Sequence, residues 1–170
     1  MLLRGQRAAP RLGASGLAPL AILVLALWAA CGGPPPAVSR GSGPAQLPTT
    51  QVTLPDGALI EAELAISSAE QARGLMFRAE LPPDRGMLFV GSRSAQRSFW
   101  MYQCLIALDI IWMDGAHRIV EIVRSAPPCG STDPGGCPSY GGNANSVYVL
   151  ELAAGQSDAH GLRIGDRLDF

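Results

Sequence analysis

A strongly apolar stretch runs from Ser98 to Asp114, SFWMYQCLIALDIIWMD, with Asp109 as the one acid among its apolar residues. The stretch is too rich in aromatic and β-branched residues, and too short, for a surface helix or a membrane span. It therefore predicts two core strands, over 98–101 and 108–114, joined by a tight bend.

Shorter patterns predict the other elements. Pro55-Asp56-Gly57 predicts a hairpin turn. Ser67 and Glu70 have the spacing of a capping box, which predicts a short helix through Arg73, ended by Gly74 in a left-handed conformation. A turn or short helix is expected at 153–161. Strands are predicted over 51–54, 58–66, 87–90, 118–124, 147–152 and 167–170. The expected fold is a β-dominated α+β domain, a small, mostly antiparallel, barrel-like sheet with one or two short helices.

A long loop, residues 125–146, contains Cys129 and Cys137. Loops of this length in compact domains are usually functional or cross-linked. In an exported protein, two cysteines this close in sequence predict a local disulfide. A zinc site is the alternative, and it is disfavoured because the two thiols have no neighbouring His and form no CxxC unit.

The first 31 residues have the layout of a secretory signal. Arg4, Arg7 and Arg11 precede an apolar segment over 17–30, which is followed by Cys31. The sequence Leu-Trp-Ala-Ala-Cys resembles a bacterial lipobox, with Trp28 where that pattern prefers Leu. We expect Cys31 to be lipidated, the alternatives being cleavage after an alanine or an uncleaved anchor. The predicted location is the periplasmic side of the inner or outer membrane.

Residues 32–50, rich in Gly, Pro and Ser, bury too little apolar surface to fold and predict a flexible tether. Residues 51–170 are then enough for one domain. This domain has nine arginines against fourteen acids, and hence a net charge near −5. The balance argues against a nucleic-acid partner, and we expect a monomer held at the membrane by its lipid.

Seven short motifs occur in order along the chain: Arg73-Gly74-Leu75-Met76-Phe77-Arg78, Gly86-Met87-Leu88-Phe89, Phe99-Trp100-Met101, Leu108-Asp109-Ile110, Cys137-Pro138-Ser139-Tyr140, Val149-Leu150-Glu151-Leu152 and Ala154-Gly155. Together they resemble the DUF192 (UPF0127) family. The resemblance covers about Val52 to Phe170 and implies a small, mostly exported, β-rich domain with no settled activity. The chain departs from the family pattern at Tyr102-Gln103-Cys104, where members commonly have Lys-Asn-Thr, and at Ala107, where they have Pro.

Charged residues within apolar segments are the first candidates for chemistry. A lone buried carboxyl group is costly, so we expect Asp109 to have a partner, most naturally an arginine. One interpretation is an internal network of arginines and carboxylates that only holds the fold. The functional interpretation is that an arginine keeps free donors and binds an anion in a pocket with an aromatic wall. The predicted ligand-binding residues are Arg73, Met76, Arg78, Phe99, Trp100, Asp109 and Glu151. Because Phe99 and Trp100 are adjacent on a predicted strand, at most one should line a given pocket.

Other chemistry has weaker support in the sequence. Met76, Met87, Met101 and Met113 raise a copper hypothesis, but they form no Met-x-x-Met repeat and have no nearby His. We therefore predict no metal and no cofactor. Cys104 is the odd cysteine, either an inert thiol, a partner in another pairing or a nucleophile. No phosphate loop or nucleophile elbow is present in the sequence.

Three functions follow from these observations. The favoured one is a membrane-tethered module that binds a small molecule or anion between the central strands and the cross-linked loop. The second is a structural or accessory envelope protein. The third is a hydrolase using Asp109 or Glu151. The three are separable in a structure: an unpaired arginine in a pocket favours binding, two carboxyl groups in one cavity favour hydrolysis, and a filled core with paired charges favours the structural role.

Overall fold

The computed structural model describes residues 46–170, and the predicted signal and most of the tether lie outside them. Six strands form one mixed sheet in the order β1-β2-β3-β8-β5-β6, and two form a separate small sheet, β4-β7. None of the helices in this part of the chain is long and apolar enough to cross a membrane. The strands are β1 (Thr49–Thr53), β2 (Leu59–Ala65), β3 (Arg85–Gln96), β4 (Phe99–Trp100), β5 (Leu108–Met113), β6 (Ile119–Ala126), β7 (Ser139–Tyr140) and β8 (Asn145–Ala153), and the helices are α1 (Ser68–Arg73), α2 (Gln156–Ala159) and the 3-10 turn η1 (Pro134–Gly136).

Local sequence signals explain the start of the domain. β1 and β2 pair antiparallel around the predicted turn, and β1 begins at Thr49, two residues inside the predicted tether. Ser67 and Glu70 form the predicted capping box of α1. Gly74 follows the helix with a positive φ of 47°, although its ψ of −135° is not that of the left-handed helix. The α1 crossover lets β2 and β3 pair in parallel, while the other four pairings of the main sheet are antiparallel.

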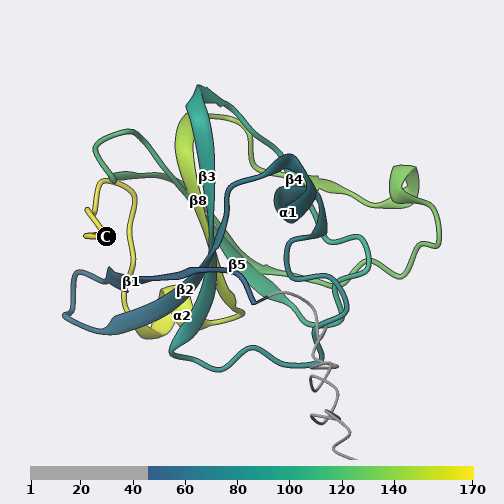
Figure 1. The fold of residues 1–170 in the computed structure, drawn as a ribbon, viewed down its shortest axis with the longest axis horizontal. Coiled ribbons are helices and arrows are strands. Elements are labelled where there is room, and N and C mark those ends of the chain that lie inside the picture. The colour runs from purple at the N-terminus through teal and green to yellow at the C-terminus, as the bar shows by residue number, and fades with distance from the viewer. Residues whose placement is uncertain (1–45) are drawn as a thin grey trace, which may run out of the picture. The chain divides into compact units, whose positions relative to one another are not determined.

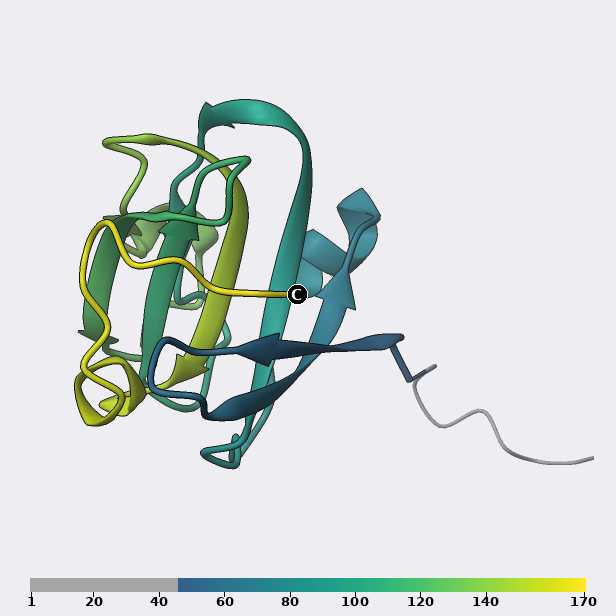
Figure 2. The same ribbon diagram turned by 90° about the vertical axis from the view of Figure 1, so that its left-hand side faces the viewer.

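The main sheet has a core cluster on each face. All six residues of β5 are buried, and the five apolar ones are divided between the two clusters. Ile111 and Met113 belong to the cluster that packs against Leu162 and Leu168 near the C-terminus. Leu108, Ile110 and Trp112 belong to the other cluster, which also contains Leu75, Met101 and Cys104. In Figures 1 and 2 the C-terminal segment lies on one side of β3 and β8, and Figure 1 shows α1 and β4 on the other side. We call these the C-terminal face and the α1 face.

Three expectations about the fold are wrong in detail. Residues 98–101 do not form a core strand; only Phe99 and Trp100 are extended, and they pair with β7 outside the main sheet. The sheet is not closed into a barrel, because its edge strands β1 and β6 do not pair with each other. The predicted last strand, 167–170, makes only isolated bridges, Thr53 to Asp169 and Arg118 to Arg167. The C-terminal segment therefore covers the opening between the two edges without completing a barrel.

The long loop contains a disulfide between Cys129 and Cys137, with an S–S distance of 2.03 Å. The backbone N–H of Cys129 donates to the carbonyl of Met101 at 3.2 Å, so the cross-linked loop is attached to the segment after β4. β7 then returns to pair with β4. The loop thus forms part of the α1 face.

Candidate functional site

A cavity of about 600 Å³ opens on the α1 face. Its walls come from α1 and the residues after it, from β3 and β8, and from β4 with the segment that follows. Its volume is within the range of small-molecule sites. Five of the seven predicted ligand-binding residues line it, namely Arg73, Met76, Phe99, Trp100 and Glu151. Arg78 and Asp109 do not.

Glu151 is the one carboxyl group among the residues that line this cavity. It lies on β8 between Met87 of β3 and Ile110 of β5, and the residue is only 4% exposed. Among residues 46–170 its carboxyl group has no hydrogen-bond or ion-pair partner, and burial raises its pKa to about 8. At neutral pH this side chain is mainly the uncharged acid, which can both donate and accept a hydrogen bond.

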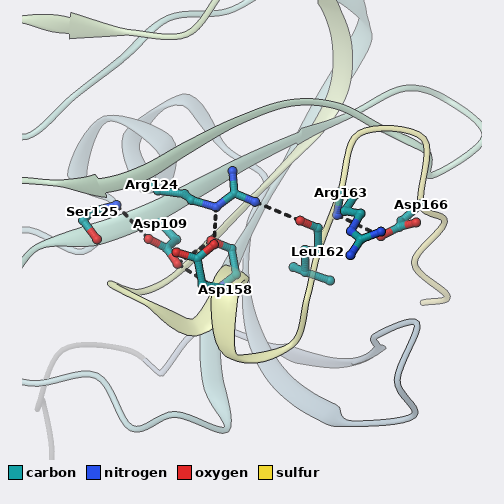
Figure 3. Close-up of polar contacts among 8 residues, drawn as sticks. Asp109, Arg124, Ser125, Asp158, Leu162, Arg163 and Asp166 are labelled. Atoms are coloured by element: carbon teal, nitrogen blue, oxygen red, sulfur yellow. Dashed lines mark hydrogen bonds and ion pairs between the residues drawn. The ribbon is translucent and has the colours of Figure 1, made fainter.

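Asp109 is fully buried on the opposite face, and its partners are not arginines as the sequence predicted. Its Oδ1 accepts from the backbone N–H of Ser125 at 2.8 Å. Its Oδ2 accepts from both the N–H and the hydroxyl of Ser157, each at 2.7 Å. Ser125 has a positive φ of 51°, at a point where the β5 and β6 register shifts. Figure 3 shows Asp109 next to Ser125, while Arg124 reaches Asp158 and Leu162 instead. Asp109 therefore fixes a bulge and the start of α2.

The two predicted arginines have different surroundings. Arg78 donates through both terminal nitrogens to the two carboxyl oxygens of Glu63, each at 2.6 Å. This pairing lowers the pKa of Glu63 and raises the pKa of Arg78. Arg73 lines the cavity, is exposed, and makes no hydrogen bond or ion pair through its side chain in the described part of the chain. Its fork of donors is available to a ligand.

Arg97 is a cavity residue that the sequence analysis missed. One of its terminal nitrogens donates to the carbonyl of Arg93 at 3.0 Å, while its Nε is buried and has no partner within residues 46–170. Its own carbonyl accepts from the indole N–H of Trp112 at 2.8 Å. Arg97 follows polar residues at the end of β3, and the one sign of a site near it in the sequence is the apolar Phe99-Trp100 pair after Ser98.

The expectation that at most one of Phe99 and Trp100 lines a given pocket is wrong, because both line the cavity. The ring of Phe99 makes edge contacts with Phe89 and Trp112, at centroid distances of 4.9 and 5.8 Å. Trp100 is 45% exposed and lies 6.0 Å from the ring of Tyr102. β4 is only two residues long and lies at the cavity rim, so the face rule of a long strand does not apply to it.

Cys104 lines the cavity near Glu151. Burial, with a contribution from Glu151, raises the pKa of its thiol to about 11. A thiol held in its protonated form is a poor nucleophile. In the described chain no cluster of three or more His, Cys, Asp or Glu side chains could hold a metal ion.

Two solved structures are similar to this chain. A crystal structure of a protein of unknown function from Novosphingobium aromaticivorans DSM 12444 has 32% identity and a TM-score of 0.65, covering 82% of this chain and all of the other. A second structure, from Sinorhizobium meliloti 1021, is described as a "putative transcription regulator"; it has 29% identity and a TM-score of 0.67, covering 75% of this chain and 97% of that one. No curated protein matches the chain significantly.

Residues 51–170 match the model of DUF192, a family described as "Uncharacterized ACR", and the chain belongs to that family. The match covers the whole length of the Novosphingobium chain, so that chain shows this fold without a further domain.

Proposed function

We propose that this DUF192 domain binds a small ligand with an anionic group in the cavity of the α1 face. Arg73 anchors the anion at the cavity edge, and Met76, Phe99 and Trp100 contact the apolar part of the ligand. The volume of about 600 Å³ suits a molecule of metabolite size.

The observation that supports this proposal best is the state of Arg73. It lines the cavity without an ion pair in the described chain, whereas Arg78, five residues later, is fully engaged by Glu63. A guanidinium group with free donors binds carboxylates and phosphates through two parallel hydrogen bonds. The chain thus has a binding group left free beside an apolar wall.

The other two functions have less support. A hydrolase that uses paired carboxyl groups would need both in one cavity, and Asp109 lies on the other face with its oxygens occupied. A purely structural domain would fill this space, yet the cavity stays open next to the buried Glu151. Regulation of transcription through DNA contact, suggested by the description of the Sinorhizobium protein, is disfavoured here by the net charge near −5 of residues 51–170.

The test is calorimetric titration of the domain, residues 46–170, with 3-phenylpropanoate as a small aromatic carboxylate. We expect Arg73→Ala to weaken binding by about tenfold or more, since hydrogen bonds to a charged group contribute roughly 1.5–3 kcal/mol. Arg163→Ala is the matched control, because Arg163 is an exposed arginine that does not line the cavity. Equal affinity in Arg73→Ala and wild type, or no binding at millimolar concentration, would refute the proposal.

The proposal includes export and a lipid anchor at Cys31, which lies outside the described residues. The disulfide between Cys129 and Cys137 supports it, because such bridges form in oxidising compartments. Metabolic labelling with a radioactive fatty acid should mark the wild-type chain and leave Cys31→Ser unlabelled. Label that persists in Cys31→Ser would contradict the anchor, and a fully reduced Cys129 and Cys137 in the native host would contradict export.

A further inference from the structure

The carboxyl group of Glu151 has no hydrogen-bond or ion-pair partner within residues 46–170. It is 4% exposed and lines the cavity, and its neighbours in register are Met87 and Ile110. A buried polar group without a hydrogen bond costs free energy, and folded proteins rarely leave one unpaired. An acid in this position, aimed into an open space, indicates that its partner arrives with a ligand.

The charged groups of the cavity are separated from one another. Arg73 and Arg97 both line it, but neither forms an ion pair or hydrogen bond with Glu151. Arg97 is held by the carbonyl of Arg93, and its buried Nε is also without a partner. The cavity therefore holds two cationic side chains and an acid that is paired with neither of them, with Met76 and the ring of Phe99 among the apolar lining.

We infer that the ligand carries a basic nitrogen in addition to its anionic group, and that this nitrogen binds the carboxyl group of Glu151. The inference rests on the proposed binding of the anionic group by Arg73. The ligand class is a zwitterion of amino-acid or short-peptide size with an aromatic or other apolar side chain.

Charge explains why a basic nitrogen fits better than a neutral group. An uncharged acid and an uncharged ligand form only neutral hydrogen bonds, whereas an ammonium group forms a stronger, charge-assisted one and supplies the charge that makes ionised Glu151 stable in a buried site. With a pKa of about 8, Glu151 holds its proton in most molecules at pH 7. Binding of the ammonium group then transfers that proton from the Glu151 carboxyl to solvent, and the ligand nitrogen keeps its own protons.

The experiment uses three probes that share one ring. Phenylalanine has both charged groups, 3-phenylpropanoate lacks the amine, and 2-phenylethylamine lacks the carboxylate. Each is titrated calorimetrically into the domain at pH 7 in two buffers with different ionisation enthalpies. The proteins are wild type, Glu151→Gln, Arg73→Ala and the control Arg163→Ala.

We expect phenylalanine to bind wild type about tenfold or more tighter than 3-phenylpropanoate, with release of close to one proton per molecule bound. Glu151→Gln, which has nearly the shape of the neutral acid, should bind both at the weaker affinity and release no proton. The proton count in the wild type tests the inference independently of any variant.

The outcomes separate this inference from the proposed function. If 3-phenylpropanoate binds as tightly as phenylalanine and depends on Arg73, the anionic site stands and the role of Glu151 is wrong. If 2-phenylethylamine binds with proton release and Arg73→Ala has no effect on phenylalanine, the anion anchor is wrong and Glu151 acts alone. If none of the three binds at millimolar concentration, both the proposed function and this inference are overturned.

Discussion

Each face of the main sheet has one buried carboxyl group, and only one of the two groups has hydrogen-bond donors around it. Asp109 on β5 faces the C-terminal face, where three donors from Ser125 and Ser157 occupy its two oxygens. Glu151 on the adjacent strand β8 faces the α1 face, where it has no partner in the described chain and an open cavity beside it. The two acids are thus similarly buried, but Asp109 holds the fold together while Glu151 is available to bind a ligand.

The difference teaches that burial alone does not identify a functional acid. Asp109 and Glu151 are 0% and 4% exposed, so exposure would rank them together. What separates them is whether the fold supplies hydrogen-bond donors, and for Asp109 it does so with a bulge and the first turn of α2. An acid that the fold leaves unsatisfied destabilises the folded chain, and is therefore the better candidate for a ligand site.

The largest effect on stability should come from Asp109→Ala. The substitution leaves the two N–H groups and the hydroxyl that Asp109 binds without their acceptor in a buried place. Each such loss costs roughly 1–3 kcal/mol, so we expect a total of about 3–5 kcal/mol and a melting temperature lower by about 10 °C or more. Urea denaturation measures this, with Asp84→Ala as control, because Asp84 is exposed and its side chain makes no hydrogen bond or ion pair within residues 46–170. A loss below about 1 kcal/mol would show that the C-terminal face does not depend on this acid.

The next effect is a pH dependence that comes from Glu151. Its pKa rises from 4.5 to about 8 on folding because the charged form is desolvated. Below about pH 4.5 the acid is protonated in both states and costs nothing. Between there and about pH 8 the unfolded chain releases the proton while the folded chain keeps it, so the free energy of unfolding falls by up to roughly 1.4 kcal/mol per pH unit. Above about pH 8 the loss is complete.

Denaturation from pH 4.5 to 8.5 measures this contribution as a difference between wild type and Glu151→Gln. The variant should gain stability over wild type as pH rises, while Glu80→Gln, at an exposed site, should follow wild type. Parallel curves for wild type and Glu151→Gln would mean that Glu151 has a partner in solution, and the contrast between the faces would disappear.

Much of the fold was accessible from sequence because local signals determine it. The capping box at Ser67 and Glu70, the turn at Asp56, and the apolar run of β5 correspond to elements of the structure. The strand at 98–101 was wrong because an apolar pattern does not say which sheet a segment joins. The sequence also did not predict that the sheet is open, because closing a sheet into a barrel depends on whether edge strands far apart in the sequence pair with each other.

The sequence predicted which types of residue form the site, but not which residues pair with one another. Apolar flanks marked Asp109 and Glu151 equally, and two arginines around Met76 looked alike. Only the fold brings Glu63 to Arg78 and Ser157 to Asp109, across 15 and 48 residues of sequence. Arg97 was missed because its sequence neighbours are polar and its cavity position arises from the path of the chain after β3.

Removal of the disulfide should affect one face only. In the chain-entropy model, Cys129→Ser with Cys137→Ser lowers stability by roughly 2.5 kcal/mol for so short a loop. Because the loop attaches to Met101 and pairs through β7 with β4, we expect faster hydrogen exchange at the α1 face and little change in β6 or the C-terminal segment. Hydrogen exchange with mass spectrometry makes the comparison. Equal acceleration on both faces would show that they unfold as one unit and are not separable in stability.

The smallest expected effect on stability is the difference between two arginines, one paired and one unpaired in the described chain. Arg78→Ala removes a two-pronged, half-buried pair and leaves Glu63 alone, so it should cost about 1 kcal/mol. Arg73→Ala removes an exposed side chain without a partner in the described chain, and should change the free energy of unfolding by less than about 0.5 kcal/mol. Urea denaturation of the two variants in parallel measures the difference. A larger loss in Arg73→Ala than in Arg78→Ala would mean that Arg73 holds the fold together in solution, and an arginine occupied in that way would not be free to bind a ligand.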